Sequence, residues 1–199
     1  MLAVGAMYED SSTDGINSQE DNNALKAGAV YLFKDAGEDW SQEAYIKASN
    51  SDAGDQFGSS VSLSGDGNYL IAGAPREDSL VIPENSMEDN NEEGGDSGAA
   101  YVINLNNNTQ ARLKDIYNII GNSYDEFGYS VALSTDGKTM AIGAPSEDSS
   151  NDNYANNDLW MAGAVYLFKK VNGVWVQEAY LKTPLPEWRA LLGSAMSLS

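Results

Sequence analysis

The sequence predicts an all-β fold, a β-propeller built of four-stranded antiparallel blades, with three repeats in 199 residues. Three observations support this prediction. A long phrase at residues 57–75 recurs 70 positions later, at residues 127–145. A second, shorter phrase occurs three times between copies of the first. Helical periodicity is nowhere convincing, whereas short runs rich in β-branched and aromatic residues are frequent.

The long phrase predicts the first two strands of each blade. Both copies begin with Phe-Gly, continue through an apolar run to Asp-Gly, and end a second apolar run with Gly-Ala-Pro. Asp-Gly at 66–67 and 136–137 predicts tight hairpins, because these residues tolerate positive φ. Proline then ends the second strand, since it lacks a ladder donor. Residues 2–7 repeat the second half of the phrase, and residues 192–199 repeat its first half.

The short phrase is Gly-Ala-x-Tyr, where x is Val in the first and last copies and Ala in the middle copy. It predicts the third strand at 28–33, 98–103 and 163–168. A turn and a fourth strand follow at 40–47, 110–114 and 175–182, and the middle copy of this strand is degenerate and lacks Trp. We therefore expect one domain over residues 1–199. Its repeats are 1–56, completed by a first strand from 192–199, then 57–126 and 127–191.

Phe57-Gly58 with Gly73-Ala74-Pro75, and the matching residues at 127–128 and 143–145, resemble the FG-GAP repeats of integrin α-subunit β-propellers and their bacterial relatives. The resemblance covers essentially the whole chain, although Met7 replaces the proline in the first copy and Leu192 replaces the phenylalanine in the last. It implies a non-catalytic extracellular or cell-surface module for binding or adhesion. The integrin-type calcium motif, Asp-x-Asp-x-Asp-Gly in the first hairpin of a blade, is missing, so its sites are not carried over.

The recurring glycines and phenylalanines are expected to pack rather than to bind a ligand. Glycine lets neighbouring strands approach closely near the propeller axis, where larger residues would clash. Phe57 and Phe127 are expected to fill the core of the blades.

The composition excludes several kinds of chemistry. The chain carries 11 Lys plus Arg against 30 Asp plus Glu, a formal charge of −19, and it has no His and no Cys. Catalytic triads with His, zinc sites of the usual ligand types, haem sites, iron–sulfur sites and disulfides are therefore excluded. The negative charge makes nucleic acid and anionic membrane surfaces poor partners. No apolar run is long enough for membrane insertion, and residues 1–6 do not resemble a signal peptide.

The connections between strands two and three, at residues 8–27, 76–97 and 146–162, are far longer than the usual loop of about 4–6 residues. Each connection begins with Glu-Asp and carries a later pair of Asp and Asn. Oxygen ligands at recurring positions suit Ca²⁺, which takes about 6–8 of them. The candidate calcium ligands are Asp10, Asp14, Asn17, Asp21, Asp78, Asp89, Asp148 and Asp158. The alternative is a solvated acidic surface.

Three aromatic residues lie in these connections. Tyr8, Tyr154 and Trp160 are candidate ligand-binding residues, because exposed aromatic rings can stack on sugars. The alternative is that they anchor the loops or belong to the core. We expect a protein or glycan ligand. Two further classes stay open, a carbohydrate-active enzyme that uses paired carboxylates and a structural spacer of a larger surface protein, although no catalytic motif is found.

Three blades are fewer than the 4–8 of a closed propeller. We expect residues 193–199 to pair with residues 2–6 of a second copy, so that a homodimer closes a six-bladed ring by strand exchange. The alternative is that the chain is a fragment of a longer gene.

Overall fold

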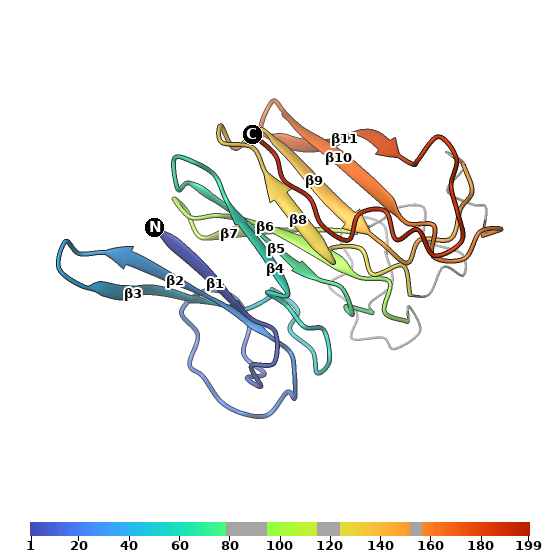
Figure 1. Cartoon of the computed structure of the whole chain (residues 1–199). Helices are drawn as coiled ribbons and strands as arrows, with labels where there is room; N and C mark the ends of the chain where they lie inside the picture. Colours follow the sequence, from blue (N-terminus) through green and yellow to red (C-terminus); the bar gives the residue numbers. More distant parts are fainter. Residues whose placement is uncertain (79–94, 115–123, 152–156) are drawn as a thin grey trace.

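The computed structural model describes residues 1–78, 95–114, 124–151 and 157–199. These residues form eleven strands in three antiparallel sheets, and none of the described residues is helical (Figure 1). The predicted all-β class is confirmed.

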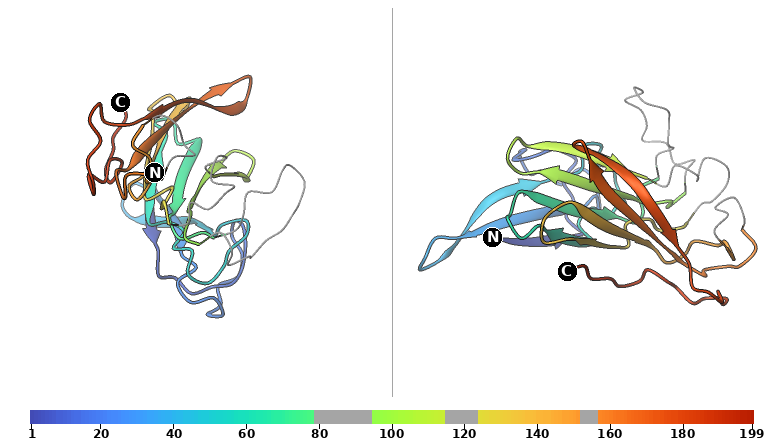
Figure 2. Two further views of the ribbon diagram at one scale, coloured as in Figure 1. Left: turned by 90° about the vertical axis from the view of Figure 1, so that its right-hand side faces the viewer. Right: turned by 90° about the horizontal axis from the view of Figure 1, so that it is seen from above.

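Each sheet is a meander in which neighbours in sequence are neighbours in space. The first sheet has three strands, in the order β1 (Leu2–Ala6), β2 (Ala29–Asp35) and β3 (Trp40–Ile46). The second has four, β4 (Ser60–Leu63), β5 (Tyr69–Ala74), β6 (Ala99–Asn104) and β7 (Thr109–Leu113). The third also has four, β8 (Ser130–Leu133), β9 (Thr139–Ala144), β10 (Ala164–Val171) and β11 (Val174–Leu181). The sheets lie side by side in sequence order, like the blades of a propeller (Figure 1 and Figure 2).

The turn chemistry places the hairpins where the sequence predicts them. β4 and β5 pair across Asp66-Gly67, where Gly67 has a φ of 70° and its N–H donates to the Ser64 carbonyl at 2.9 Å. Asn172-Gly173 joins β10 to β11, and both residues have positive φ, as a two-residue hairpin turn of this hand requires. β5 and β9 each end one residue before a proline.

Glycine backbones form close contacts between neighbouring sheets. A Cβ added to Gly5 would lie 1.8 Å from the carbonyl oxygen of Gly58, and one added to Gly73 would lie 1.8 Å from that of Gly128. The same contact joins Gly143 to Gly193, at 2.1 Å. The close approach predicted for these glycines is therefore confirmed.

The two phenylalanines of the long phrase lie in the core. Phe57 and Phe127 are fully buried and pack edge to face against Tyr101 and Tyr166 of the third strands. Each forms an isolated parallel β-bridge with the glycine just before the third strand of the preceding sheet. Leu192 forms the same β-bridge with Gly163. Leu192 therefore occupies the position of a third phenylalanine.

The chain ends at two open strand edges. β1 pairs only with β2, so the edge that carries a first strand in the other two sheets is free. Residues 193–199 lie where the first strand of a further sheet would begin, and they form no strand within the chain. Among the described residues, no helix is long and apolar enough to cross a membrane.

Candidate functional site

Three long connections leave the same edge of the three sheets. Link 1 (residues 7–28), link 2 (75–98) and link 3 (145–163) join strands two and three of each sheet. The short hairpins lie at the opposite ends of the sheets (Figure 1 and Figure 2). We call the edge that carries the links the rim. The links contain most of the residues that the sequence singles out, so the rim is the candidate site.

The glutamate of each acidic pair forms an ion pair with a lysine at the rim. Each glutamate lies three residues after strand two, and each lysine directly follows strand four. Strands two and four flank strand three and run in the same direction, so their ends meet at one edge. The pairs are Glu9 with Lys47 at 2.8 Å, Glu77 with Lys114, and Glu147 with Lys182.

These ion pairs are buried. No side chain of the six is more than 11% exposed, and Glu77 and Glu147 are 1% and 2% exposed. Serine hydroxyls complete the sites in links 1 and 3, where Ser11 and Ser149 donate to the glutamates. Burial opposes ionisation of Glu9, but the hydrogen bonds from Lys47 and Ser11 outweigh it and hold its pKa below the ordinary value. The glutamates therefore anchor the links to the sheets.

In links 1 and 3, the aspartate of the acidic pair holds the backbone of its own link. Asp10 Oδ1 accepts the N–H of Lys26 at 2.7 Å, and Asp148 Oδ1 accepts the N–H of Met161 at 2.6 Å. The donors, Lys26 and Met161, are both in the left-handed region, with φ of 60° and 54°. These carboxylates tie the beginning of a link to its end.

The later aspartates close the links a second time. Asp21 accepts the N–H and hydroxyl of Ser12 at 2.7 and 2.9 Å, and Asp158 accepts the N–H of Ser150 at 3.0 Å. The Ser12 N–H and the other donors to Asp21 lower its pKa to about 2.

The other predicted ligands are spread over the rim. Asp14 accepts the N–H of Ser51 at 2.8 Å, and Asn17 accepts the N–H of Tyr45 at 3.0 Å. Burial raises the pKa of Asp78, with a further contribution from Glu77. Asp89 lies outside the described residues. Among the residues that are described, no three acidic side chains come together as a metal site would require. The calcium site stays a prediction, for which the described links offer no shared ligand set.

The predicted aromatic residues are exposed where they are described. Tyr8 is 60% exposed, with the Lys26 ammonium 5.6 Å from its ring centre. Trp160 is 51% exposed and lies beside Trp188, which the sequence analysis does not single out. Tyr154 lies outside the described residues.

A cluster of carboxyl groups between the first two sheets is also missed by the sequence analysis. Asp55 is 2% exposed, and its carboxylate accepts the N–H of Asp52 at 3.0 Å. Burial, and then the charge of Glu77, raises the pKa of Asp55 to about 8. Burial, and then Asp78, raises the pKa of Asp52 to about 6. The sequence pattern that could have indicated this cluster is an aspartate two residues before each Phe-Gly, at 55 and 125. Both aspartates are buried.

Comparison with protein families gives one result that bears on this geometry. The model of the FG-GAP repeat matches residues 40–103 and 121–168, which together are more than half of the chain. The matched segments include the Phe-Gly and Gly-Ala-Pro phrases and most of the third strands of the second and third sheets. A search of curated proteins gives no match.

Proposed function

Because the chain belongs to the FG-GAP repeat family, whose repeats are typical of adhesion and surface proteins, we propose that it is a non-catalytic extracellular binding module. It recognises a protein or glycan ligand through the rim. One observation carries the proposal: the three links leave one edge of the sheets and are anchored there by buried Glu–Lys pairs. Side chains that vary between links are thereby held on a fixed frame, which is how rigid scaffolds present binding loops.

Arrays of immobilised glycans and extracellular matrix proteins test this proposal. We expect the fluorescently labelled chain to bind members of one class without altering them, and the heat-denatured chain to lose that binding. Binding to neither class would overturn the proposal and favour a structural spacer.

A catalytic function is the second candidate, and the carboxyl cluster favours it. Asp52 and Asp55 have pKa values raised to about 6 and about 8, and carboxyl groups with separated pKa values are typical of acid–base catalysis. Asp55 is 2% exposed, which counts against contact with a substrate. Release of reducing sugar from polysaccharides by the native chain, abolished in Asp52→Asn, would establish this alternative.

We further propose that a second copy completes the open sheet. Leu2 and Val4 of β1 are 47% and 41% exposed, whereas the corresponding residues of β5, Leu70 and Ala72, are fully buried. Residues 195–198 correspond to β4, which covers β5 in the second sheet. Transferring that register pairs Ala195 with Gly5, Met196 with Val4, Ser197 with Ala3 and Leu198 with Leu2.

Cross-linking tests both the pairing and its register. The chain has no cysteine, so the double variant Val4→Cys/Met196→Cys carries the only two thiols. We expect a disulfide-linked dimer under mild oxidation, and Val4→Cys/Ser194→Cys, which is two residues out of register, should cross-link far less. A monomeric mass by light scattering across the micromolar range would overturn the proposal.

A further inference from the structure

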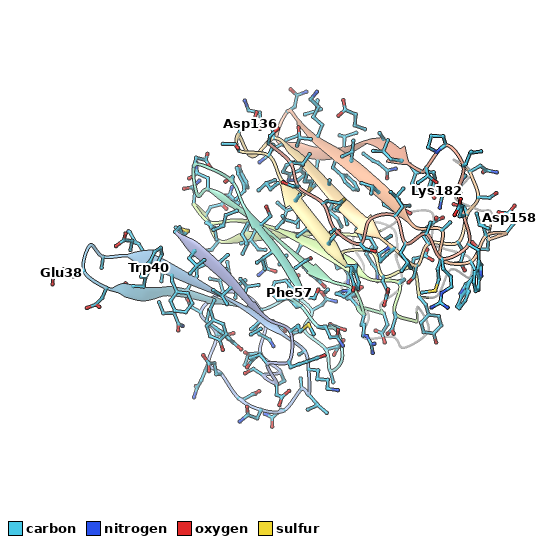
Figure 3. All side chains as sticks on the ribbon, viewed as in Figure 1. Glu38, Trp40, Phe57, Asp136, Asp158 and Lys182 are labelled. Atoms are coloured by element: carbon cyan, nitrogen blue, oxygen red, sulfur yellow. The ribbon has the colours of Figure 1, made fainter. Side chains whose placement is uncertain are left out.

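Two exposed tryptophans and an arginine meet at the rim beside link 3. The ring centroids of Trp160 and Trp188 are 5.7 Å apart and their planes are inclined by 41°. The Arg189 guanidinium lies 5.5 Å from the first ring and 5.4 Å from the second. The two tryptophans are 51% and 61% exposed. We call these three residues the indole platform. Asp158 of link 3 and Trp40, at the tip of the first sheet, lie at opposite ends of the molecule (Figure 3).

The platform occupies a position that recurs once for each sheet, where the end of a link pairs with the segment that leads out of that sheet. We call each such position a junction. The Arg189 N–H donates to the Trp160 carbonyl at 3.1 Å. The same backbone bond joins Gly54 to Leu25 and Tyr124 to Gly95, both at 2.9 Å. The three junctions therefore share one backbone frame, on which only the side chains differ.

The exposure of the platform does not arise from a missing neighbour. At the other two junctions the next sheet is present, yet Leu25 is 65% exposed and Tyr124 is 61% exposed. A further sheet after residue 192 would therefore leave Trp160 and Arg189 accessible at the rim.

The third junction carries a residue that its backbone does not favour. Arg189 has a φ of 57°, whereas the first junction has Gly54 at 102°. A residue with a side chain costs roughly 1–2 kcal/mol in this region, and glycine does not. Among the described residues, Arg189 forms no ion pair with a carboxylate. Its contacts with the two indole rings are exposed, and at about 0.5–1 kcal/mol each they do little more than offset the backbone cost. Folding therefore gains little from an arginine here.

We propose that the indole platform binds a neutral polysaccharide chain, an inference that rests on the proposed binding function and specifies its ligand. Flat indole faces stack on the C–H faces of pyranose rings, and the guanidinium donates hydrogen bonds to their hydroxyl groups. The charge of −19 repels polyanions, and Arg189 beside both rings repels cations. An uncharged ligand meets neither obstacle.

Titration calorimetry with cellohexaose, mannohexaose and laminarihexaose tests this inference, with polygalacturonate as the charged comparison. We expect at least one neutral hexasaccharide to bind and to change tryptophan emission. Trp160→Ala and Trp188→Ala should each weaken binding about tenfold or more, as loss of a central aromatic anchor does. Trp40→Ala, at an equally exposed tryptophan far from the platform, should bind like the native chain.

Arg189→Gly separates a binding role from a structural one. It restores the residue of the first junction, so its melting temperature should equal or exceed that of the native chain while its affinity falls. Neutral-glycan binding that survives all three platform substitutions would overturn the inference and leave the proposed function intact. Binding only to polygalacturonate or only to proteins would overturn it in the same way. Failure to bind any glycan or protein would overturn both proposals.

Discussion

Links 1 and 3 share one skeleton and differ in what they display. Both have a buried Glu–Lys pair, a serine on the glutamate, and an aspartate that accepts a backbone N–H from the end of the link. They differ at the junction, where Leu25 and Gly54 in the first correspond to Trp160 and Arg189 in the third. Acidic residues that recur therefore build the rim, and residues that do not recur are the ones available for recognition.

Removal of a buried lysine should have the largest effect on the shared skeleton. Lys182→Met leaves the Glu147 carboxylate buried without its cation, so the free energy of unfolding in urea should fall by about 3–5 kcal/mol. Lys47→Met should cost a similar amount if links 1 and 3 are equivalent.

Lys169→Met is the matched control, because the Lys169–Glu178 pair is 3.6 Å long and about half exposed. It should cost under about 1 kcal/mol. Equal losses at 169 and 182 would contradict the structural role given to the buried pairs.

Substitution of the contact glycines should give the next largest loss of stability. It also distinguishes a contact between two complete sheets from a contact with residues 193–199, which are in no sheet. Gly73→Ala places a Cβ 1.8 Å from the Gly128 carbonyl oxygen and should cost up to about 3 kcal/mol, because the overpacked backbones must move apart. Gly143→Ala faces Gly193, whose following residues are in no sheet and can shift. It should cost less by thermal unfolding, and the reverse order would argue that residues 193–199 are held firmly.

The carboxyl cluster at the first junction predicts a pH dependence. The pKa of Asp55 is raised to about 8 in the folded chain from an ordinary 3.8, so the folded state binds the extra proton between these values. The stabilisation that this proton gives the folded state is complete below about pH 4 and is lost as the pH rises toward 8. From pH 5 to pH 7 the free energy of unfolding should fall by about 3 kcal/mol.

Asp55→Asn removes this titration, so the pH profile of its unfolding free energy should be flatter than that of the native chain. A native profile that rises over the same range would contradict the assignment, because the raised pKa of Asp52 acts in the same direction as that of Asp55.

Calcium should have the smallest effect. Asp10, Asp21, Asp148 and Asp158 already accept N–H groups of their own links, and a cation would have to compete with these donors. We expect calcium to change the melting temperature by less than about 2 °C relative to magnesium at the same concentration. A larger shift, reversed by a chelator, would support the calcium sites that the sequence predicts.

The fold is largely predictable because its signals are local. Asp66-Gly67 and Asn172-Gly173 favour hairpins through their own backbone preferences, and Pro75 stops a strand through its own ring. The repeat then extends each local signal to the whole chain. Strand four of the middle repeat, at 109–113, forms without the tryptophan of the other copies, and it pairs with β6 from Thr109 to Leu113.

The site is less predictable because its contacts join distant residues. Glu147 and Lys182 both stand in recurring phrases, yet only the meander brings the ends of strands two and four together. Trp188 meets Trp160 through the backbone pairing of residues 160 and 189, which no local pattern reveals. Asp55 looks like an ordinary turn aspartate until burial is known.

The buried Glu–Lys pairs have a consequence for stability at high ionic strength. Added salt screens the mutual repulsion of the exposed carboxylates, which stabilises the compact state of a chain with a charge of −19. The same salt scarcely reaches ion pairs whose side chains are at most 11% exposed. High ionic strength therefore weakens repulsion at the surface, while the buried ion pairs keep their attraction. The rim should hold its shape at both low and high salt concentration.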